Sequence, residues 1–185
     1  MKKYFIFIAV ALFLLLSCEK DDICDNSTAT TSRLVIGFYD VNNRSVVKNV
    51  TNLKVTGEGA PTSIVFNASA ATDELKFLTN ASTISIPLKT NSDQTKYTFI
   101  LNANPGGTPS SDIMIFNYGR NNEYVSRACG FKTVFDFSNR PAGTNAFTVN
   151  GISTGPFTTT TWIKDVEILQ TNINNEKETH VKIYF

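Results

Sequence analysis

The chain contains a single histidine, His180, close to its last residue. Hydrolases of the Ser-His-Asp or Cys-His type need an imidazole held beside a nucleophile as its base. His180 lies in a run of alternating apolar and polar residues typical of a strand, and it falls on the polar face. We therefore interpret it as a solvent-facing strand residue. We predict no catalytic residue and no enzymatic activity, and we place a hydrolase third among the functions considered.

Paired carboxylates could serve a glycosidase, which uses two of them around the scissile bond. Asp165 and Glu167 share one face of a predicted strand, Asp136 lies on another strand, and Asp73-Glu74 lie in a polar loop. Two carboxylates on one strand face are usually a solvated edge that discourages aggregation, and we interpret them so. With no C-x-x-C pair and no acidic calcium loop, the sequence predicts neither a metal site nor a cofactor.

Aromatic side chains on an exposed sheet face could stack against sugar rings. The candidates are Trp162, Tyr39, Tyr97, Tyr118, Tyr124 and Tyr184. In strands such residues more often pack in the core or against cross-strand neighbours. Tyr184 and Trp162 are kept as possible ligand-contact residues, which leaves glycan or small-ligand binding open as an alternative function.

The N-terminus has the three parts of an export signal. Lys2 and Lys3 precede an apolar run over residues 4–16, too short for a resident transmembrane helix. The run ends in Leu15-Leu16-Ser17-Cys18, which resembles the lipobox of bacterial lipoproteins. The resemblance implies a signal peptide over residues 1–17 and lipidation of Cys18, which would anchor the chain to a membrane without spanning it.

The residues after Cys18 are charged. Glu19, Lys20, Asp21 and Asp22 resemble the export tag that sends lipoproteins of Bacteroidota to the outer face of the outer membrane. A solvated linker on the periplasmic face is the alternative. We expect surface display.

Lipidation of Cys18 leaves Cys24 and Cys129 as a pair among the three cysteines. In an oxidising envelope compartment we expect them to form a disulfide. A buried free cysteine beside an incidental one is the alternative.

Removing residues 1–17 from the 185-residue chain leaves 168 residues, the usual size of one domain. We predict a tether over residues 18–32 and one domain over residues 33–185. Of 17 Lys and Arg against 16 Asp and Glu, the signal holds only Lys2 and Lys3, so the mature chain is nearly neutral. No basic block interleaves with aromatics, so nucleic acid is not an expected partner.

The domain is predicted to consist of short strands separated by turns. The expected strands are 34–39, 53–56, 63–66, 83–88, 97–101, 112–118, 124–128, 131–137, 147–149, 163–169 and 180–185. Gly119 to Asn122 suggests a hairpin between 112–118 and 124–128, and residues 70–78 allow a helical turn capped by Thr72. The spacing favours an all-β, antiparallel β-sandwich, immunoglobulin-like or jelly-roll-like.

A hairpin is predicted at the C-terminus, between 163–169 and 180–185. In its last strand Val181, Ile183 and Phe185 should face the core, while His180, Lys182 and Tyr184 face water.

Several segments together resemble an uncharacterised lipoprotein family of Bacteroidota, the domain of unknown function 6452. They are residues 18–24, 34–40, 86–90 and 180–185, and the more specific Val125-Ser126-Arg127-Ala128-Cys129-Gly130. Ser32 stands where the resemblance leads us to expect proline, a minor departure that affects only the approach to the first strand. The resemblance implies a compartment and, at most, an outer-membrane protein as a partner, but it does not indicate any activity. We expect a non-enzymatic, lipid-anchored outer-membrane protein that acts through protein contacts.

Overall fold

The computed structural model describes residues 23, 24, 28, 30–158 and 160–185. The predicted signal over residues 1–17, Cys18, and the tag of Glu19, Lys20, Asp21 and Asp22 lie outside these residues. The described part consists of strands and one 3-10 turn, η2 (Leu75–Phe77), which confirms the all-β class. Within it, no helix has the length and apolarity needed to cross a bilayer.

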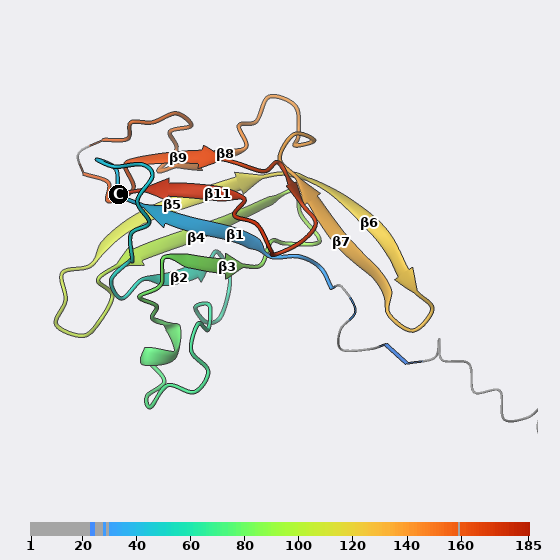
Figure 1. Cartoon of the computed structure of the whole chain (residues 1–185), viewed down its shortest axis with the longest axis horizontal. Coiled ribbons are helices and arrows are strands. Elements are labelled where there is room, and N and C mark those ends of the chain that lie inside the picture. The colour runs from blue at the N-terminus through green and yellow to red at the C-terminus, as the bar shows by residue number, and fades with distance from the viewer. Residues whose placement is uncertain (1–22, 25–27, 29, 159) are drawn as a thin grey trace, which may run out of the picture.

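Two four-stranded sheets form the body of the molecule (Figure 1). The first, called the β1 sheet, has the order β3 (Thr83–Ile86), β1 (Leu34–Tyr39), β11 (Val181–Tyr184), β9 (Asp165–Ile168). The second, called the β4 sheet, has the order β2 (Lys54–Gly57), β4 (Gln94–Leu101), β5 (Ser110–Asn117), β8 (Phe147–Val149).

One apolar core joins the two sheets. Phe38 and Ile183 come from the β1 sheet, Phe99 and Phe116 from the β4 sheet, and all four side chains are fully buried in one cluster. In β4 the burial alternates along the strand because successive side chains point to opposite faces. In β1 the first five residues are all buried.

The strand pairing agrees with the predicted C-terminal hairpin and departs from a purely antiparallel fold. β9 and β11 are antiparallel neighbours, as predicted. β1, however, pairs with β11 in parallel, from Ile36 opposite Val181 to Tyr39 opposite Tyr184. No tight turn joins these first and last strands, so nothing local imposes the antiparallel direction.

A third sheet leaves the body and carries a projecting hairpin. Its order is β10 (Asn172–Ile173), β7 (Gly130–Asp136), β6 (Gly119–Ser126). β6 and β7 extend well beyond the two sheets of the body (Figure 1). We call residues 119–136 the arm.

The arm replaces the hairpin predicted between 112–118 and 124–128, which is wrong. Residues 119–122 lie in β6, and β6 pairs with β7 instead of β5. The chain leaves β5 at Tyr118, which is fully buried. The next residue, Gly119, has to be a glycine because a Cβ there would overlap the backbone carbonyl of Asn139. The glycine marks a close approach between segments and not a turn.

Two local predictions concern the connection from β2 to β3. Residues 63–66 form no strand; instead the Ile64 N–H bonds to the Val55 carbonyl, and the Phe66 N–H to the Lys76 carbonyl. The helical turn predicted over residues 70–78 is present only as η2. The Leu75 N–H donates to Thr72 Oγ1 over 3.4 Å.

The faces predicted for the last strand are correct for Val181 and Ile183 and wrong for His180 and Tyr184, which are also buried. Segments distant in sequence cover the second face. Arg44, in the loop after β1, lies over the Tyr184 ring at 3.7 Å from its centroid. His180 is bonded through its backbone and its ring to Val35.

Candidate functional site: the arm and its disulfide

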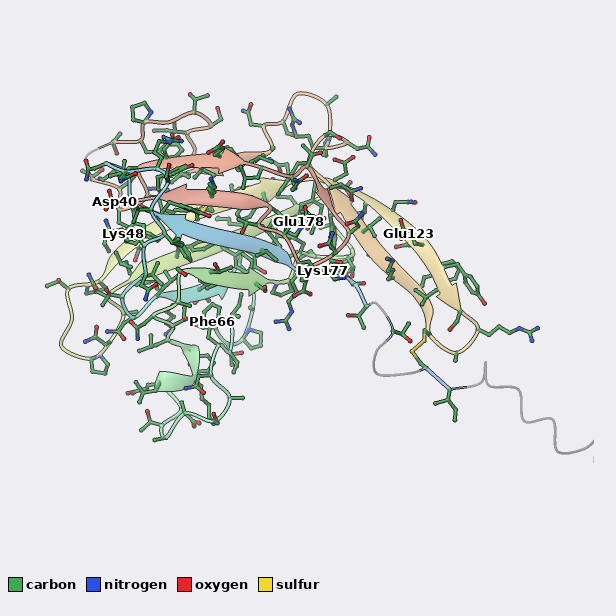
Figure 2. The ribbon with its side chains drawn as sticks, in the orientation of Figure 1. Asp40, Lys48, Phe66, Glu123, Lys177 and Glu178 are labelled. Carbon is green, nitrogen blue, oxygen red and sulfur yellow. A yellow bond between two sulfur atoms is a disulfide. The ribbon has the colours of Figure 1, made fainter. Side chains whose placement is uncertain are left out.

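The predicted disulfide is confirmed and joins the N-terminal segment to the tip of the arm. Cys24 and Cys129 are bonded, with their Cα atoms 4.9 Å apart and 105 positions apart in sequence. Figure 2 shows the bond at the far end of β6 and β7, away from the body. Because a two-stranded hairpin is marginal by itself, this covalent link supports a part of the molecule with little core.

The turn that carries Cys129 is built from the Ser-x-Ala-Cys-Gly motif. Ser126 Oγ accepts the backbone N–H of Cys129 at 3.0 Å. Gly130 has a φ of 69°, a left-handed conformation that favours glycine. The serine and the glycine therefore shape a tight turn that presents Cys129 to Cys24.

The two faces of the arm differ at its outer end. Tyr124 and Phe131 are opposite one another in the ladder, and their rings meet edge to face with centroids 5.5 Å apart. They are 60% and 68% exposed, although aromatic rings are usually covered. On the opposite face Glu123 pairs with Lys132 at 3.2 Å. One face of the outer arm is thus aromatic and the other charged.

The aromatic face continues inward to the core. Asn122 and Thr133 come next, joined by a 3.0 Å bond from Thr133 Oγ1 to Asn122 Oδ1. Phe135 follows, fully buried, with its ring 5.1 Å from that of Tyr118. The arm is therefore rooted in the body by Phe135.

The two edges of the arm are unequal. On the β7 side, the Thr133 N–H donates to Thr31 Oγ1 at 2.9 Å, and β10 pairs with Phe135 and Asp136. On the other side, β6 is the last strand of its sheet among the described residues, and residues 120–124 are exposed. An eight-residue strand thus presents an uncovered edge.

The two aromatics predicted as ligand contacts lie elsewhere and are covered. Trp162 is 8% exposed and donates from Nε1 to the Phe99 carbonyl at 3.2 Å. Tyr184 is 1% exposed and donates to Glu167 Oε2 at 2.5 Å. Burial, followed by Glu167, raises the pKa of Tyr184. Neither ring offers a face to a surface ligand.

His180 is a buried structural residue. Its Nδ1 accepts the backbone N–H of Val35 at 3.0 Å. Burial lowers the pKa of His180, and Glu178, the Asn175 backbone and Glu176 oppose this effect. The lowered pKa favours the neutral imidazole, whose Nδ1 ties β1 to the residue before β11.

The carboxylates of β9 share a face, as predicted, and Arg44 lies between them. Its Nη1 is 2.6 Å from Asp165 Oδ2, and its Nη2 is 3.9 Å from Glu167 Oε2. Asp136 accepts the N–H of Ser138 and caps a turn. No three His, Cys, Asp or Glu side chains within the described ranges are grouped to hold a metal ion.

One motif was missed by the sequence-based prediction. Gly151-Ile152-Ser153-Thr154-Gly155 matches G-x-S-x-G, the pattern of the nucleophile elbow, in which the serine turns between a strand and a helix. Here Ile152 bridges back to Val149, and Phe157 bonds to Lys164 in a loop that leads to β9. The described residues supply no helix after Ser153, so the elbow is not formed.

The exposed pair of the arm was also missed. Tyr124 was one of six candidate aromatics, and Phe131 was assigned to a strand without a role. The sequence does contain a pattern that predicts this pair. Tyr124 and Phe131 flank a short segment with a cysteine and a glycine, and a hairpin turn there would place the two residues opposite one another.

The fold and site together define an all-β protein with a projecting, disulfide-bound arm. Residues 52–185 match the model of a family described as Family of unknown function (DUF6452), and the chain belongs to this family. The match includes the whole arm and begins after β1. No curated protein matches the chain, and no solved structure does.

Proposed function

We propose that this chain is a non-enzymatic lipoprotein of Bacteroidota, lipid-anchored at Cys18 in the outer membrane and acting through protein contacts as an accessory component. Its body is a β-sandwich of the immunoglobulin-like or jelly-roll-like kind. Display on the cell surface is favoured over the periplasmic face because of the charged residues after Cys18.

The observation that supports a protein contact is the open edge of β6. A strand with unpaired backbone groups is a template for a strand from another chain. The β7 edge of the same hairpin is covered by Thr31 and by β10. This asymmetry supports a contact surface, because the fold covers one edge and leaves the other available.

The partner proposed is an outer-membrane protein. A lipid on Cys18 would confine the chain to a membrane surface, where neighbouring membrane proteins are its most frequent encounters. The disulfide holds the arm close to the same N-terminal segment. The open edge would then lie at the height of segments that emerge from the bilayer.

The anchor is tested by labelling cells that express the full chain with a clickable palmitate analogue. The protein should carry the label, and Cys18→Ala should lose it. A labelled Cys18→Ala protein, or an unlabelled wild type, contradicts the anchor. Trypsin treatment of intact cells tests display: degradation only after lysis contradicts the surface location.

The contact is tested with a photoreactive amino acid at Asn122, an exposed position of β6, and at Val65, an exposed position on the body. An outer-membrane protein should be crosslinked from position 122 and not from position 65. Equal crosslinking from both positions, or none from position 122, contradicts a contact at this edge.

A second candidate is glycan binding, which one feature favours. A hollow of about 740 Å³ beside the root of the arm is lined by polar side chains, among them Asp93, Arg120, Asn139 and Arg140. Arg120 donates to Asp93 Oδ1 at 2.6 Å. A glycan array probed with wild type and Asn139→Ala tests it. Binding that persists in the variant, or no binding at all, rules out this hollow as a glycan site.

A further inference from the structure

We infer that the tip of the arm is a membrane-contact surface, on which Tyr124 and Phe131 insert into the headgroup region of the bilayer that holds the lipid anchor. This inference rests on the proposed lipidation of Cys18 and adds an orientation: the arm points toward the membrane and the body away from it.

The length of chain between the two cysteines limits where the tip can be. Cys24 follows Cys18 by six positions. A fully extended chain gains about 3.3–3.6 Å per residue, so Cys24 stays within roughly 20 Å of the lipidated residue. The disulfide fixes Cys129 to Cys24 and so applies the same limit to the turn of the arm.

Without the bond the body would be held through a much longer tether. The first strand of the body, β1, begins at Leu34, sixteen positions after Cys18. The covalent attachment nearest the lipid is instead at the far end of a projecting hairpin (Figure 2). The element closest to the bilayer is therefore the tip of the arm.

The chemistry of the tip fits a membrane interface. Tyr124 and Phe131 expose most of their surfaces, and Ile23, next to Cys24, is 82% exposed. Tyr concentrates at the level of lipid headgroups because it combines an apolar body with a polar tip, and Phe is typical of the apolar face of segments that lie in the interface. The bilayer that would hold the lipid anchor is the apolar surface nearest the tip, which explains why aromatic rings are exposed at this place.

The charge distribution agrees with insertion of one face. Glu123 and Lys132 pair with one another on the opposite face, so the aromatic face can approach lipid without carrying this pair into it. Figure 2 shows Phe66 on the body, well separated from the tip of the arm. Only the tip should therefore sense lipid.

The test uses the full lipidated chain in phosphatidylcholine vesicles, with or without bromine atoms near the top of the acyl chains. Phe131→Trp places a fluorescent reporter on the tip, and Tyr124→Trp repeats the measurement on its neighbour. Val65→Trp is the matched control, since Val65 is 50% exposed and lies on the body. The native Trp162 is buried and contributes the same background to each variant.

We expect brominated vesicles to reduce the emission of the reporters at positions 131 and 124 and to leave that at position 65 unchanged. When Cys24→Ala and Cys129→Ala are added, the decrease in emission that bromine causes at position 131 should become smaller, while the protein remains on the vesicles. Flotation separates the two proposals. Protein that fails to float contradicts the anchor and, with it, the inference. Protein that floats with an unquenched tip, or with equal quenching at position 65, overturns the inference alone.

Discussion

In the body, strands are held together by a core that both sheets share, whereas in the outer arm they are held by one ladder and one disulfide. The contrast is clearest along β7. Phe135 and Phe131 lie on the same face of this strand, yet Phe135 is fully buried and Phe131 is 68% exposed. The same residue type thus supports the fold at one end and is presented to the surroundings at the other.

The largest effect is expected from removing the disulfide, with Cys24→Ala and Cys129→Ala combined. A closed loop of about 100 residues restricts the unfolded chain by roughly 4–5 kcal/mol in the loop-entropy model, so the free energy of unfolding should fall by about that amount. Guanidinium unfolding of the full chain in detergent measures it. Reduction of the wild-type protein should give the same change.

Hydrogen exchange sharpens this prediction. Amides of the outer arm should lose protection in the double variant, whereas those of β4 and β5 should keep it, because their core is intact. A uniform loss over both regions would show that the arm and the body unfold as one unit.

Truncation along β7 compares the two regions directly. Phe135→Ala removes a buried ring and should cost about 3–5 kcal/mol of unfolding free energy. Phe131→Ala removes an exposed ring and should cost less than about 1 kcal/mol. Urea unfolding of the two variants measures both losses of unfolding free energy and so compares them. Similar costs at both positions would contradict the division between a packed root and an exposed tip.

Local patterns in the sequence predicted elements that depend on local residues. β1 matches its prediction because a run of β-formers stops at Asp40, and the disulfide was predicted by setting aside the lipobox cysteine, which leaves two of the three. Gly119 was misjudged, since its partner Asn139 is remote in the chain and only the crossing between sheets brings them together. The same holds for Tyr184, which Arg44 covers from a distant loop.

The open edge of β6 depends on which strands neighbour it, and no local pattern contains that information.

A smaller effect is expected from His180, which belongs to the body and titrates. Its pKa is lowered by burial, so the unfolded chain binds a proton near pH 6.5 while the folded chain does not. Stability is therefore complete above about pH 6.5 and falls as the pH drops toward the folded pKa.

His180→Asn tests this dependence, because Asn can still accept the Val35 N–H and does not titrate. Unfolding free energies measured between pH 5.5 and pH 8 should fall toward acid in wild type and less so in the variant. Parallel curves for the two proteins would assign the acid sensitivity to other groups. No comparable titrating group is buried in the described part of the arm. The protection of its amides against hydrogen exchange should therefore not change with the titration of His180.

The smallest effect concerns the contact between Tyr124 and Phe131. Cross-strand aromatic pairs couple by about 0.5–1 kcal/mol, so a double-mutant cycle with Tyr124→Ala and Phe131→Ala should give a coupling in that range. The same cycle on Glu123 and Lys132, on the opposite face, should give about 0.5 kcal/mol or less and decline with salt, because ion pairs near the surface are screened. If the aromatic coupling in detergent vanished, the two rings would not hold each other at the tip. The exposure of the two rings would then have to be explained without a preformed aromatic surface. The arm would serve only as a spacer between the anchor and the body.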